Sequence, residues 1–478
     1  MKQGRFGAAT ASLLASARLI TPLAWPVLVG QLAVLAFATV DTVLIARYGV
    51  VDLAALAIGS AAFVTIFIGF MGVVLALSPI VGRHFGAGDL PQAGREAHQA
   101  VWVALALSVA GSTLLLFPAP FLALSQASPE VSAKVRGFLT ALAFSLPASL
   151  LFTVYRAFNT AVSRPKAVMA LQLGGLALKV PLSTALVFGV PGLGIPALGV
   201  TGCGISTAVA MWAQVLLALW LLRRDSFYTP FALLGRGLDR PRLAALKAQL
   251  RLGVPMGAAI VIEVTGFAFM AIFIARLGTT AVAGHQLAAN LVSLMFMMPL
   301  ALANATGTLV AQQLGAGDGR AAERLAWHGL VLATGISVLM ALALLAGRHG
   351  VLGLYTRDGA VLAAALPLLA WLAAFHVADA AQTVAVFVLR AYHVAVVPVL
   401  IYVAALWGVG LGGGWLLAFD TSGSVPAAWR GAPGYWIAAT AGLVLAAAAL
   451  AAFMAWVLRQ SRQPPQPPQP RVPQPAPP

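Results

Sequence analysis

Three carboxylates stand in the middle of long apolar stretches of the chain. Asp41 follows Phe-Ala-Thr-Val, Glu263 follows Ile-Val-Ile and Asp379 follows Phe-His-Val-Ala. An ionised carboxylate inside a membrane is costly unless a partner or water stabilises it, so each must face a cavity or a partner. Burial also favours the protonated acid, which makes each one a candidate proton site. The alternative for each is a structural hydrogen bond to a neighbouring helix.

Glu263 and Asp379 both belong to the second half of the chain, so they can meet in the fold. Two close carboxylates share a proton or hold a small cation such as Na⁺, because two negative charges repel strongly in a low dielectric. The pattern therefore predicts an ion-coupling site at Glu263 and Asp379, with Asp41 as a third coupling residue. Two separately satisfied acids remain the alternative.

Polar side chains accompany these acids at helical spacing. His376 lies three residues before Asp379 and Gln382 three residues after it, so we expect them to share one helical face. Gln31 precedes Asp41 in an otherwise apolar stretch. We expect these side chains to line a cavity, with packing between helices as the alternative. A further polar stripe of the same kind consists of His285, Gln286 and Asn290.

Lys179 is the basic counterpart of these acids. It stands in Leu-Lys-Val-Pro within an apolar stretch of the first half, where Asp41 is the one mid-span acid. A buried Lys either loses its proton or finds an acid, so we hypothesise an ion pair between Lys179 and Asp41. In the competing interpretation, Lys179 lies near a helix end and extends its ammonium to the membrane interface.

The composition defines the elements that must position these residues. Hydrophobic residues make up 61% of the chain and charged residues 9%, and the mean hydropathy is +0.93. These values exclude a water-soluble globule and indicate a multi-span membrane protein. The net charge of +16 reflects basic residues near helix ends, so topology explains it and nucleic acid does not. Cys203 is the single cysteine, which excludes an intrachain disulfide.

Stretches long enough to cross a bilayer, which takes roughly twenty residues, predict twelve helices and an all-α integral membrane protein. Gly- and Pro-rich segments separate them. The expected helices are 20–47, 54–82, 97–117, 135–157, 167–190, 200–222, 251–276, 281–312, 325–346, 361–389, 395–419 and 434–458.

An internal repeat divides these helices into two lobes of six related by a pseudo-twofold axis. Each residue of the second copy follows its counterpart by the same number of positions, and a constant offset without a gap indicates duplicated halves. The matching pairs are Pro26 and Pro255, Arg47 and Arg276, Gly49 and Gly278, Gly86-Ala87-Gly88-Asp89 and Gly315-Ala316-Gly317-Asp318, and Arg95 and Arg324.

Charge and composition set the domain plan. We expect an N-terminal segment 1–19, an N-lobe 20–222, a basic linker 223–250, a C-lobe 251–458 and a disordered Pro/Gln-rich tail 459–478. Most Lys and Arg residues fall on one side of the predicted membrane, which places both termini in the cytoplasm. For the linker we favour a solvated tether over a lipid-binding segment. Arg156 and Arg390, near the ends of two helices, are interpreted as interface anchors.

Several motifs resemble one protein family. The similarity spans roughly residues 15–460 and identifies the multidrug and toxic compound extrusion family, in its NorM-like branch. The residues that carry it in the first half are Trp25-Pro26, Val40-Asp41-Thr42, Asp52-Leu53-Ala54-Ala55, Ser78-Pro79 and Gly86-Ala87-Gly88-Asp89. Those in the second half are Gly284-His285-Gln286, Phe296-Met297-Met298-Pro299, Asp379 and Leu389-Arg390-Ala391-Tyr392.

The resemblance implies an exporter of organic, often cationic, compounds driven by inward flow of protons or sodium through a cavity between two lobes. By motif match, Asp41 falls on the first-lobe coupling acid, and Glu263 and Asp379 on the second-lobe cation-binding acids. Phe267 and Phe375 would lie beside that second site, where aromatic faces attract drug cations.

Three positions depart from the family pattern. Lys179 and Ser183 replace asparagines that relatives usually carry in the fifth helix, and a fixed positive charge beside Asp41 disfavours a bound cation there. Phe375 lacks the hydroxyl that some relatives supply, which weakens a full sodium coordination shell. The positive charge of Lys179 beside Asp41 favours ion coupling in the second lobe.

We therefore predict a monomeric antiporter of a bacterial inner membrane that exports lipophilic cationic drugs or dyes, uses no cofactor besides the coupling ion, and has membrane lipid as its surroundings. A flippase of lipid-linked precursors is the alternative, although it requires a cationic cavity. An enzyme requires clustered His, Cys or acid residues at a membrane surface, and the sequence has no such cluster. The duplicated halves favour alternating access over a channel.

Overall fold

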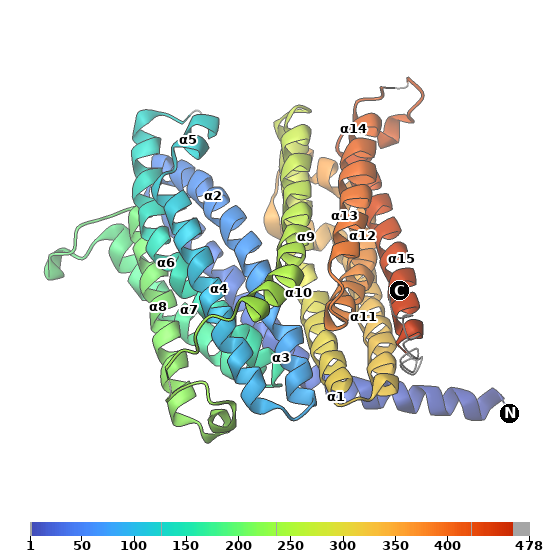
Figure 1. The fold of residues 1–478 in the computed structure, drawn as a ribbon. Coiled ribbons are helices and arrows are strands. Elements are labelled where there is room, and N and C mark those ends of the chain that lie inside the picture. The colour runs from blue at the N-terminus through green and yellow to red at the C-terminus, as the bar shows by residue number, and fades with distance from the viewer. Residues whose placement is uncertain (1, 126, 236, 422, 462–478) are drawn as a thin grey trace, which may run out of the picture.

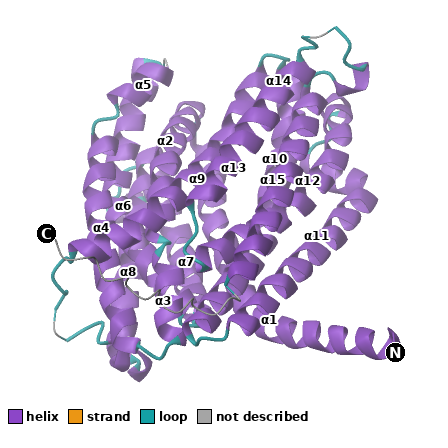
Figure 2. Ribbon diagram, turned by 45° about the vertical axis from the view of Figure 1, so that its right-hand side comes forward, coloured by secondary structure: helices purple, strands orange, loops and turns teal. Residues whose placement is uncertain are grey.

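The computed structural model describes residues 2–125, 127–235, 237–421 and 423–461, and in this part of the chain all regular elements are helices (Figures 1 and 2). Twelve helices or helix pairs within it are long and apolar enough to cross a membrane. The all-α, twelve-span fold class is therefore confirmed. Most of the predicted Pro/Gln-rich tail, from residue 462, lies outside the described residues.

The first six spans form the N-lobe. Its helices are α1 (Lys2–Tyr48), α2 (Val50–Val74), α3 (Leu77–Gly86), α4 (Leu90–Leu116), α5 (Ala119–Ser125), α6 (Pro129–Ala161), α7 (Pro165–Phe188) and α8 (Val200–Arg224), with the short 3₁₀ turns η1 (Pro191–Leu193) and η2 (Ser226–Phe231).

The last six spans form the C-lobe. Its helices are α9 (Leu243–Ala275), α10 (Thr279–Gly315), α11 (Gly319–Tyr355), α12 (Gly359–Ala391), α13 (Val396–Tyr402), the π-helical η3 (Val403–Gly412), α14 (Gly413–Ala418), the 3₁₀ turn η4 (Ala427–Trp429) and α15 (Ala432–Gln460).

Two predicted helices are interrupted in the structure. The stretch predicted as 54–82 divides into α2 and α3, because Pro79 has no N–H to bond the carbonyl of Leu75, and the chain bends there. The stretch predicted as 395–419 contains a π-helical segment. Several other helices run beyond their apolar stretch by a turn or more, since helical hydrogen bonding continues into the polar residues at the membrane surface.

The repeated Gly-Ala-Gly-Asp motif forms the same turn in both lobes. Gly88 and Gly317 have φ angles of +76° and +77°, which only glycine adopts readily. Asp89 then caps α4 by accepting a hydrogen bond from a backbone N–H, and Asp318 caps α11 in the same way. The motif therefore has a structural role at both positions.

Each lobe has its own apolar core, and α1 contacts both. One core joins residues of α2, α3, α4 and α6, whereas the second and third join residues of α9 to α15. Ile20 and Ala24 in the first part of α1 belong to a C-lobe core, and Ser16 Oγ lies 2.7 Å from His328 Nδ1 on α11. Further along, α1 packs on α7 of the N-lobe. The first helix therefore spans the junction between the lobes.

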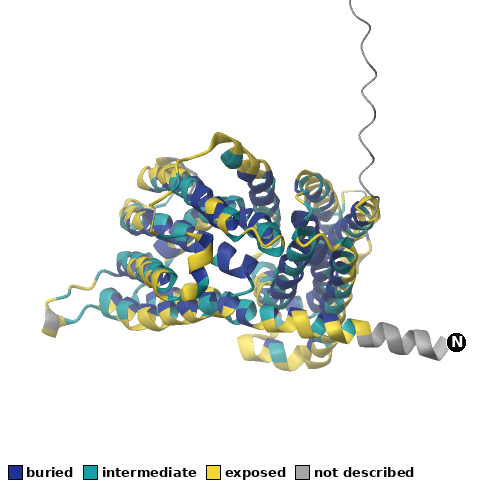
Figure 3. Ribbon diagram, turned by 60° about the horizontal axis from the view of Figure 1, so that its bottom comes forward, coloured by how far each residue is buried: buried dark blue, intermediate teal, exposed yellow. Residues whose placement is uncertain are grey.

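The outer surface is rich in large apolar side chains. Exposed residues cover the outside of the helices while buried ones line the interior of each lobe (Figure 3). Leu216, Trp220, Leu339 and Leu342 are each more than half exposed. Such a surface is stable against acyl chains and unstable in water, as a membrane-spanning protein requires.

The two lobes touch along α2 and α9 and where α3 meets α10, the latter at the end of the molecule that carries the linker between α8 and α9 (Figure 1). A Cβ added at Gly86 would lie 1.8 Å from the carbonyl oxygen of Gln312, and one at Gly315 would lie 1.9 Å from that of Arg83. Glycine is required at both positions because the backbones themselves are in contact. These two symmetric contacts close the linker end.

Two side chains at the same end cross from one lobe to the other. Arg83 Nε on α3 donates to the carbonyl of Ala391 at the end of α12, at 2.9 Å. Its repeat counterpart Gln312, on α10, donates to the carbonyl of Ala161 at the end of α6, at 2.7 Å. Each lobe thus caps a helix of the other. This reciprocal pair holds the linker end shut.

Removing this pair should open the linker end. We expect the double variant Arg83→Ala, Gln312→Ala to expose the space between the lobes from the linker side. It loses the charge-assisted bond of Arg83 and the neutral bond of Gln312, each of which contributes about 1 kcal/mol or more. A cysteine placed at Ser78 in a Cys203→Ser background should then react several times faster with a thiol reagent supplied from that side. Equal labelling rates with and without the Arg83→Ala, Gln312→Ala substitutions would show that the two bonds do not keep the linker end closed.

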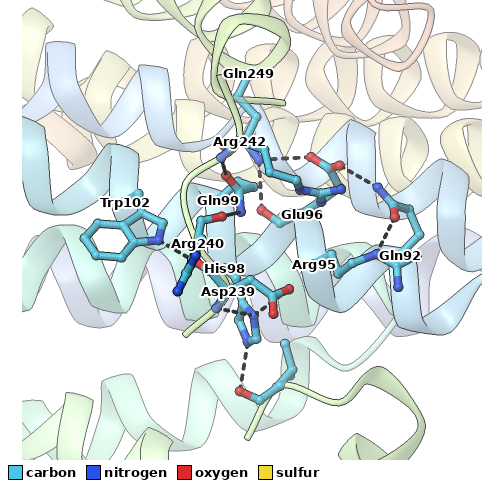
Figure 4. Close-up of polar contacts among 11 residues, drawn as sticks. Gln92, Arg95, Glu96, His98, Gln99, Trp102, Asp239, Arg240, Arg242 and Gln249 are labelled. Atoms are coloured by element: carbon cyan, nitrogen blue, oxygen red, sulfur yellow. Dashed lines mark hydrogen bonds and ion pairs between the residues drawn. The ribbon is translucent and has the colours of Figure 1, made fainter. Parts of the chain in front are cut away.

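The linker is fastened to α4. Gln99 donates to the carbonyl of Arg240 at 3.1 Å and accepts from the N–H of Arg242 at 2.7 Å, and Trp102 donates to the carbonyl of Asp239 at 2.8 Å (Figure 4). From the sequence we expect a solvated tether. The structure differs because α4 presents buried polar side chains that bond the linker backbone, a contact that linker composition does not reveal.

The start of α9 is fastened to the same helix. Gln249 donates to the carbonyl of Glu96 at 2.8 Å, and Gln92 donates to the Glu96 carboxylate at 2.8 Å (Figure 4). His98 lies 3.3 Å from the carboxylate of Asp239. The linker and the first turns of the C-lobe therefore move with α4.

Asp225, just after α8, ties the start of the linker to the N-lobe and should make stability depend on pH. The N–H of Phe227 and then Arg164, 2.5 Å away, hold the pKa of this carboxyl below its usual value of 3.8. Its contribution is therefore present above about pH 4 and is lost as pH falls through the lowered pKa.

We expect Asp225→Asn to lower the thermal unfolding temperature at pH 7, by the equivalent of about 1 kcal/mol or less because the pair is one-third exposed. The gap to the wild type should close as pH is lowered towards 3. The measurement is thermal unfolding of both proteins in detergent across this pH range. A gap of constant size would contradict the assigned cause.

Candidate functional site

A cavity of about 500 Å³ lies between the lobes. From the N-lobe it is lined by residues of α1, α2, α3, α6 and α7, and from the C-lobe by residues of α9, α10, α12 and α13. The glycine contacts close it towards the linker end, and the lobes diverge towards the opposite end (Figures 1 and 2). A space of this volume fits a drug-sized molecule.

Two of the three predicted coupling acids meet in this cavity. Glu263 on α9 and Asp379 on α12 both line it. Asp379 accepts a hydrogen bond from Gln382 Nε2 at 2.8 Å, while the other side of the Gln382 amide accepts from the hydroxyl of Tyr402. Phenol, amide and carboxylate thus form a chain of hydrogen bonds that orients Asp379. A carboxylate pair held in this way can exchange a proton or a small cation with the cavity.

Tyr402 has no counterpart among the predicted site residues. It lies at the end of α13, immediately before the π-helical η3, and lines the cavity beside Glu263 and Gln382. A π-helix widens the helical turn and commonly occurs at functional sites. In η3 it also brings Trp407 within 3.1 Å of the carbonyl of Ile262, next to Glu263. The one sequence signal for this site is a tyrosine within an otherwise apolar helix.

Of the two predicted aromatic residues, Phe267 lines the cavity and Phe375 lies behind it. The ring of Phe267 meets that of Phe375 edge-on at 5.5 Å. Phe375 is 5% exposed and packs in turn against Trp436. Phe267 can therefore contact a ligand in the cavity directly, whereas Phe375 supports it from the core.

Asp41, the third predicted acid, pairs with Lys179 outside the central cavity. Lys179 Nζ lies 2.9 and 3.0 Å from the two carboxylate oxygens and 2.5 Å from Thr207 Oγ1 on α8. Lys179 is completely buried, so its ammonium does not extend to the membrane interface. The ammonium of Lys179, at 2.9 Å, compensates the negative charge of the Asp41 carboxylate. Gln31, which precedes Asp41 on the same helix α1, does line the central cavity.

Arg156 and Arg390 are not anchors at the membrane surface. Both line the central cavity, Arg156 from α6 and Arg390 from α12. Arg390 is 8% exposed, and its guanidinium lies 4.7 Å from the ring centre of Phe387. Position near a helix end suggested the interface, but that position says nothing about which face of the helix a side chain occupies. These α6 and α12 faces point between the lobes.

Besides Lys179 and Phe375, three further residues that were predicted for the cavity are buried outside its lining. His376 and His285 are buried away from the cavity lining, and Ser183 bonds Ser206 at 2.6 Å inside the N-lobe. Three residues advance a helix by about 300°, so His376 and Gln382 diverge to opposite sides of Asp379 by about 60° each. The cavity covers the Gln382 side, and His376 therefore falls in the core.

Gln286 and Asn290 lie on α10 outside the cavity lining but in line with residues that belong to it. Both are exposed, and Asn290 accepts a hydrogen bond from Tyr355 at 2.9 Å. Neither is among the cavity-lining residues, yet both lie at helical spacing from the lining residues Ser293 and Met297, further from the linker end. They extend the same face of α10 beyond the cavity.

Comparison with known sequences gives a consistent result. The family model described as MatE matches residues 26–184 and 255–416, one match in each lobe. "Probable multidrug resistance protein NorM" of Aromatoleum aromaticum is 39% identical over 426 residues, covering 88% of this chain and 90% of the relative. "Multidrug resistance protein PmpM" of Pseudomonas aeruginosa is 33% identical, covering 89% and 88%.

Solved structures share the fold at lower identity. The eukaryotic MATE transporter AtDTX14 superposes with a TM-score of 0.82 at 19% identity, covering 94% of this chain and 99% of that one. The Vibrio cholerae MATE transporter VcmN in its bent form also has a TM-score of 0.82, at 20% identity and with coverage of 94% and 98%. These likenesses concern the fold alone.

Proposed function

This chain belongs to the MatE family and is a multidrug efflux transporter, not an enzyme, and from this premise we propose that it exports lipophilic, amine-bearing compounds in exchange for H⁺ or Na⁺. The observation that carries the proposal is the joint position of Glu263 and Asp379 on one wall of the cavity between the lobes. Phe267 beside them supplies an aromatic face for an organic cation.

The proposed cycle depends on competition for the two carboxylates. An organic ammonium binds while Glu263 and Asp379 are free of the coupling ion and carry negative charge. A proton or Na⁺ that arrives from outside neutralises the pair, which lowers the affinity for the organic cation and releases it. Gln382 and Tyr402 hold Asp379 in place throughout. Only such a difference in affinity between states can drive export.

The N-lobe takes a supporting part in this cycle. Because Lys179 already neutralises Asp41 at 2.9 Å, a second cation at Asp41 would meet a fixed positive charge. We therefore assign ion coupling to Glu263 and Asp379. The pair of Asp41 and Lys179, with Thr207, connects α1, α7 and α8 within the N-lobe.

The topology proposed with this function places the linker end in the cytoplasm of a bacterial inner membrane and the protein as a monomer. The start of α1, the linker and the end of α15 all lie towards that end (Figure 1). With the linker end closed, the cavity faces outward. The alternative, a flippase for lipid-linked precursors, calls for a cationic cavity, and Glu263 and Asp379 argue against it.

Vesicles with imposed ion gradients test this function. Purified protein is reconstituted and the movement of a fluorescent cationic dye is followed under a proton gradient, a sodium gradient, or neither. We expect one gradient to drive dye transport and an ionophore that collapses it to stop transport. A rate of dye transport that is the same with and without either gradient would overturn coupled antiport. The gradient that drives transport identifies the coupling ion.

A further inference from the structure

The two walls of the central cavity differ in charge. On the C-lobe wall stand Glu263 and Asp379 together with Arg390. On the N-lobe wall, the one lining residue with an ionisable side chain is Arg156. Both acids of the lining therefore stand on the C-lobe wall, beside Arg390, while the N-lobe wall carries an arginine and no acid among its lining residues.

Arg156 has no partner for its charge among the residues that the structure describes. Within the described residues its guanidinium makes no hydrogen bond and no ion pair, and only its backbone carbonyl is used, by Thr160 at 2.8 Å. The other arginines at the lobe interface differ from it. Arg83 bonds the end of α12. The guanidinium of Arg390 also lacks a hydrogen bond and an ion pair within the described residues, but it lies over the ring of Phe387 and interacts electrostatically with Glu263 on its own wall. An unpaired guanidinium within a membrane protein is costly, so Arg156 is available to an anionic group that enters the cavity.

The surroundings of Arg156 suit an anion. Its planar guanidinium is charged at any physiological pH and presents five N–H donors in a fork that matches a carboxylate. The amides of Gln31 and Gln172 line the same wall and add neutral donors. No carboxylate of this wall competes for Arg156, since Asp41 is held by Lys179 outside the cavity.

We propose that Arg156 is an anion-binding subsite of this cavity and recognises the anionic group of an amphoteric substrate. In such a compound an amine lies against Glu263 and Asp379 while a carboxylate, or another single anionic oxygen group, binds Arg156. The inference rests on the proposed function and adds the residue that recognises the anionic group. A cavity of about 500 Å³ lets one drug-sized molecule reach both walls.

This arrangement makes the substrate a bridge between the lobes. Its anionic group is held by α6 of the N-lobe and its amine by α9 and α12 of the C-lobe. When the coupling ion neutralises the two acids, the amine contact weakens and the bridge opens at its C-lobe end. A compound with only an amine contacts one lobe and binds more weakly.

The test uses a matched pair of fluorescent probes. One is a rhodamine with a free carboxyl group and the other is the same rhodamine as its methyl ester, which keeps the cation and removes the anion. Binding to the full-length protein in lipid nanodiscs is followed by fluorescence anisotropy at constant ionic strength. We expect the wild type to bind the free acid about tenfold more tightly than the ester, as a charge-assisted pair warrants.

Variants locate this preference at Arg156. In Arg156→Gln the ratio of the two affinities should fall to about one, and in Arg156→Lys it should be intermediate, since an ammonium binds a carboxylate without the bidentate fork. Arg136→Gln is the matched control, because Arg136 is an exposed arginine on the same helix outside the cavity. The control should keep the wild-type ratio.

The outcomes separate this inference from the proposed function. If wild-type protein shows no preference for the free acid, or if the preference survives in Arg156→Gln, the anion subsite is wrong even when the ester is exported by an ion gradient. If neither probe is bound or moved, the proposed function itself fails. The wild-type comparison needs no variant, so a misfolded Arg156→Gln leaves the proposal testable.

Discussion

Asp379→Asn should abolish the gradient-driven part of dye export. The substitution keeps the shape of the side chain and its contact with Gln382, but it removes the charge that the coupling ion and the organic cation compete for. Loss of one charge-assisted contact of about 1.5–3 kcal/mol already weakens cation binding roughly tenfold or more, and the coupling step is lost with it. Initial rates of dye efflux from vesicles with and without the gradient measure the effect.

Glu263→Gln should behave in the same way, because the two acids act as one pair. The matched control is Asp239→Asn, the same chemical change on the linker outside the cavity, which should leave the gradient-driven rate near that of the wild type. Gradient-driven export that persists in both cavity variants would remove Glu263 and Asp379 from the mechanism and return the question to Asp41.

Lys179→Met should be the most destabilising single substitution in the N-lobe. It fills a similar volume but leaves the Asp41 carboxylate without its partner among α1, α7 and α8. Breaking one side of a buried ion pair costs about 3–5 kcal/mol, because the remaining charge is still desolvated. Thermal unfolding of the purified protein in detergent measures the loss.

The double variant Lys179→Met, Asp41→Asn should recover most of this stability, since no uncompensated charge remains. It should also retain gradient-driven export if coupling resides in the C-lobe. Two outcomes contradict the assignment. Additive losses in the double variant would show that the two residues do not interact, and loss of export in a stable double variant would make Asp41 a coupling residue.

The fold could be predicted from the sequence because the signals are local and repeated. Twelve apolar stretches of membrane-spanning length determine the helices, and the constant offset between the halves relates the lobes. The Gly-Ala-Gly-Asp motif predicted a turn in both halves, and Asp89 and Asp318 cap the next helices there. The predicted helix ends are less accurate. An apolar stretch marks the part of the helix inside the membrane, whereas the helix itself continues as far as its backbone hydrogen bonds do.

The site could be predicted only where a rare residue type marked it. A carboxylate in an apolar helix is unusual, and Glu263 and Asp379 do share the cavity. Arginines near helix ends are common, so Arg156 and Arg390 were assigned to the membrane surface. Which face a helix turns towards its neighbours depends on packing between distant segments. A lone tyrosine in an apolar helix is a weak signal for Tyr402, and no sequence motif marks the π-helix that follows it.

The linker has a mechanical consequence. Gln99 and Trp102 bind its backbone to α4, and Gln249 binds the first turns of α9 to the same helix. The covalent connection between the halves is therefore a rigid extension of the N-lobe and not a slack tether. The duplicated halves are therefore unequal. The first half of α9 is bound to the N-lobe, by Gln249 to α4 and by the backbone contacts of Gly253 and Gly257 to α2. If the lobes rock, we expect α9 to bend beyond Gly257.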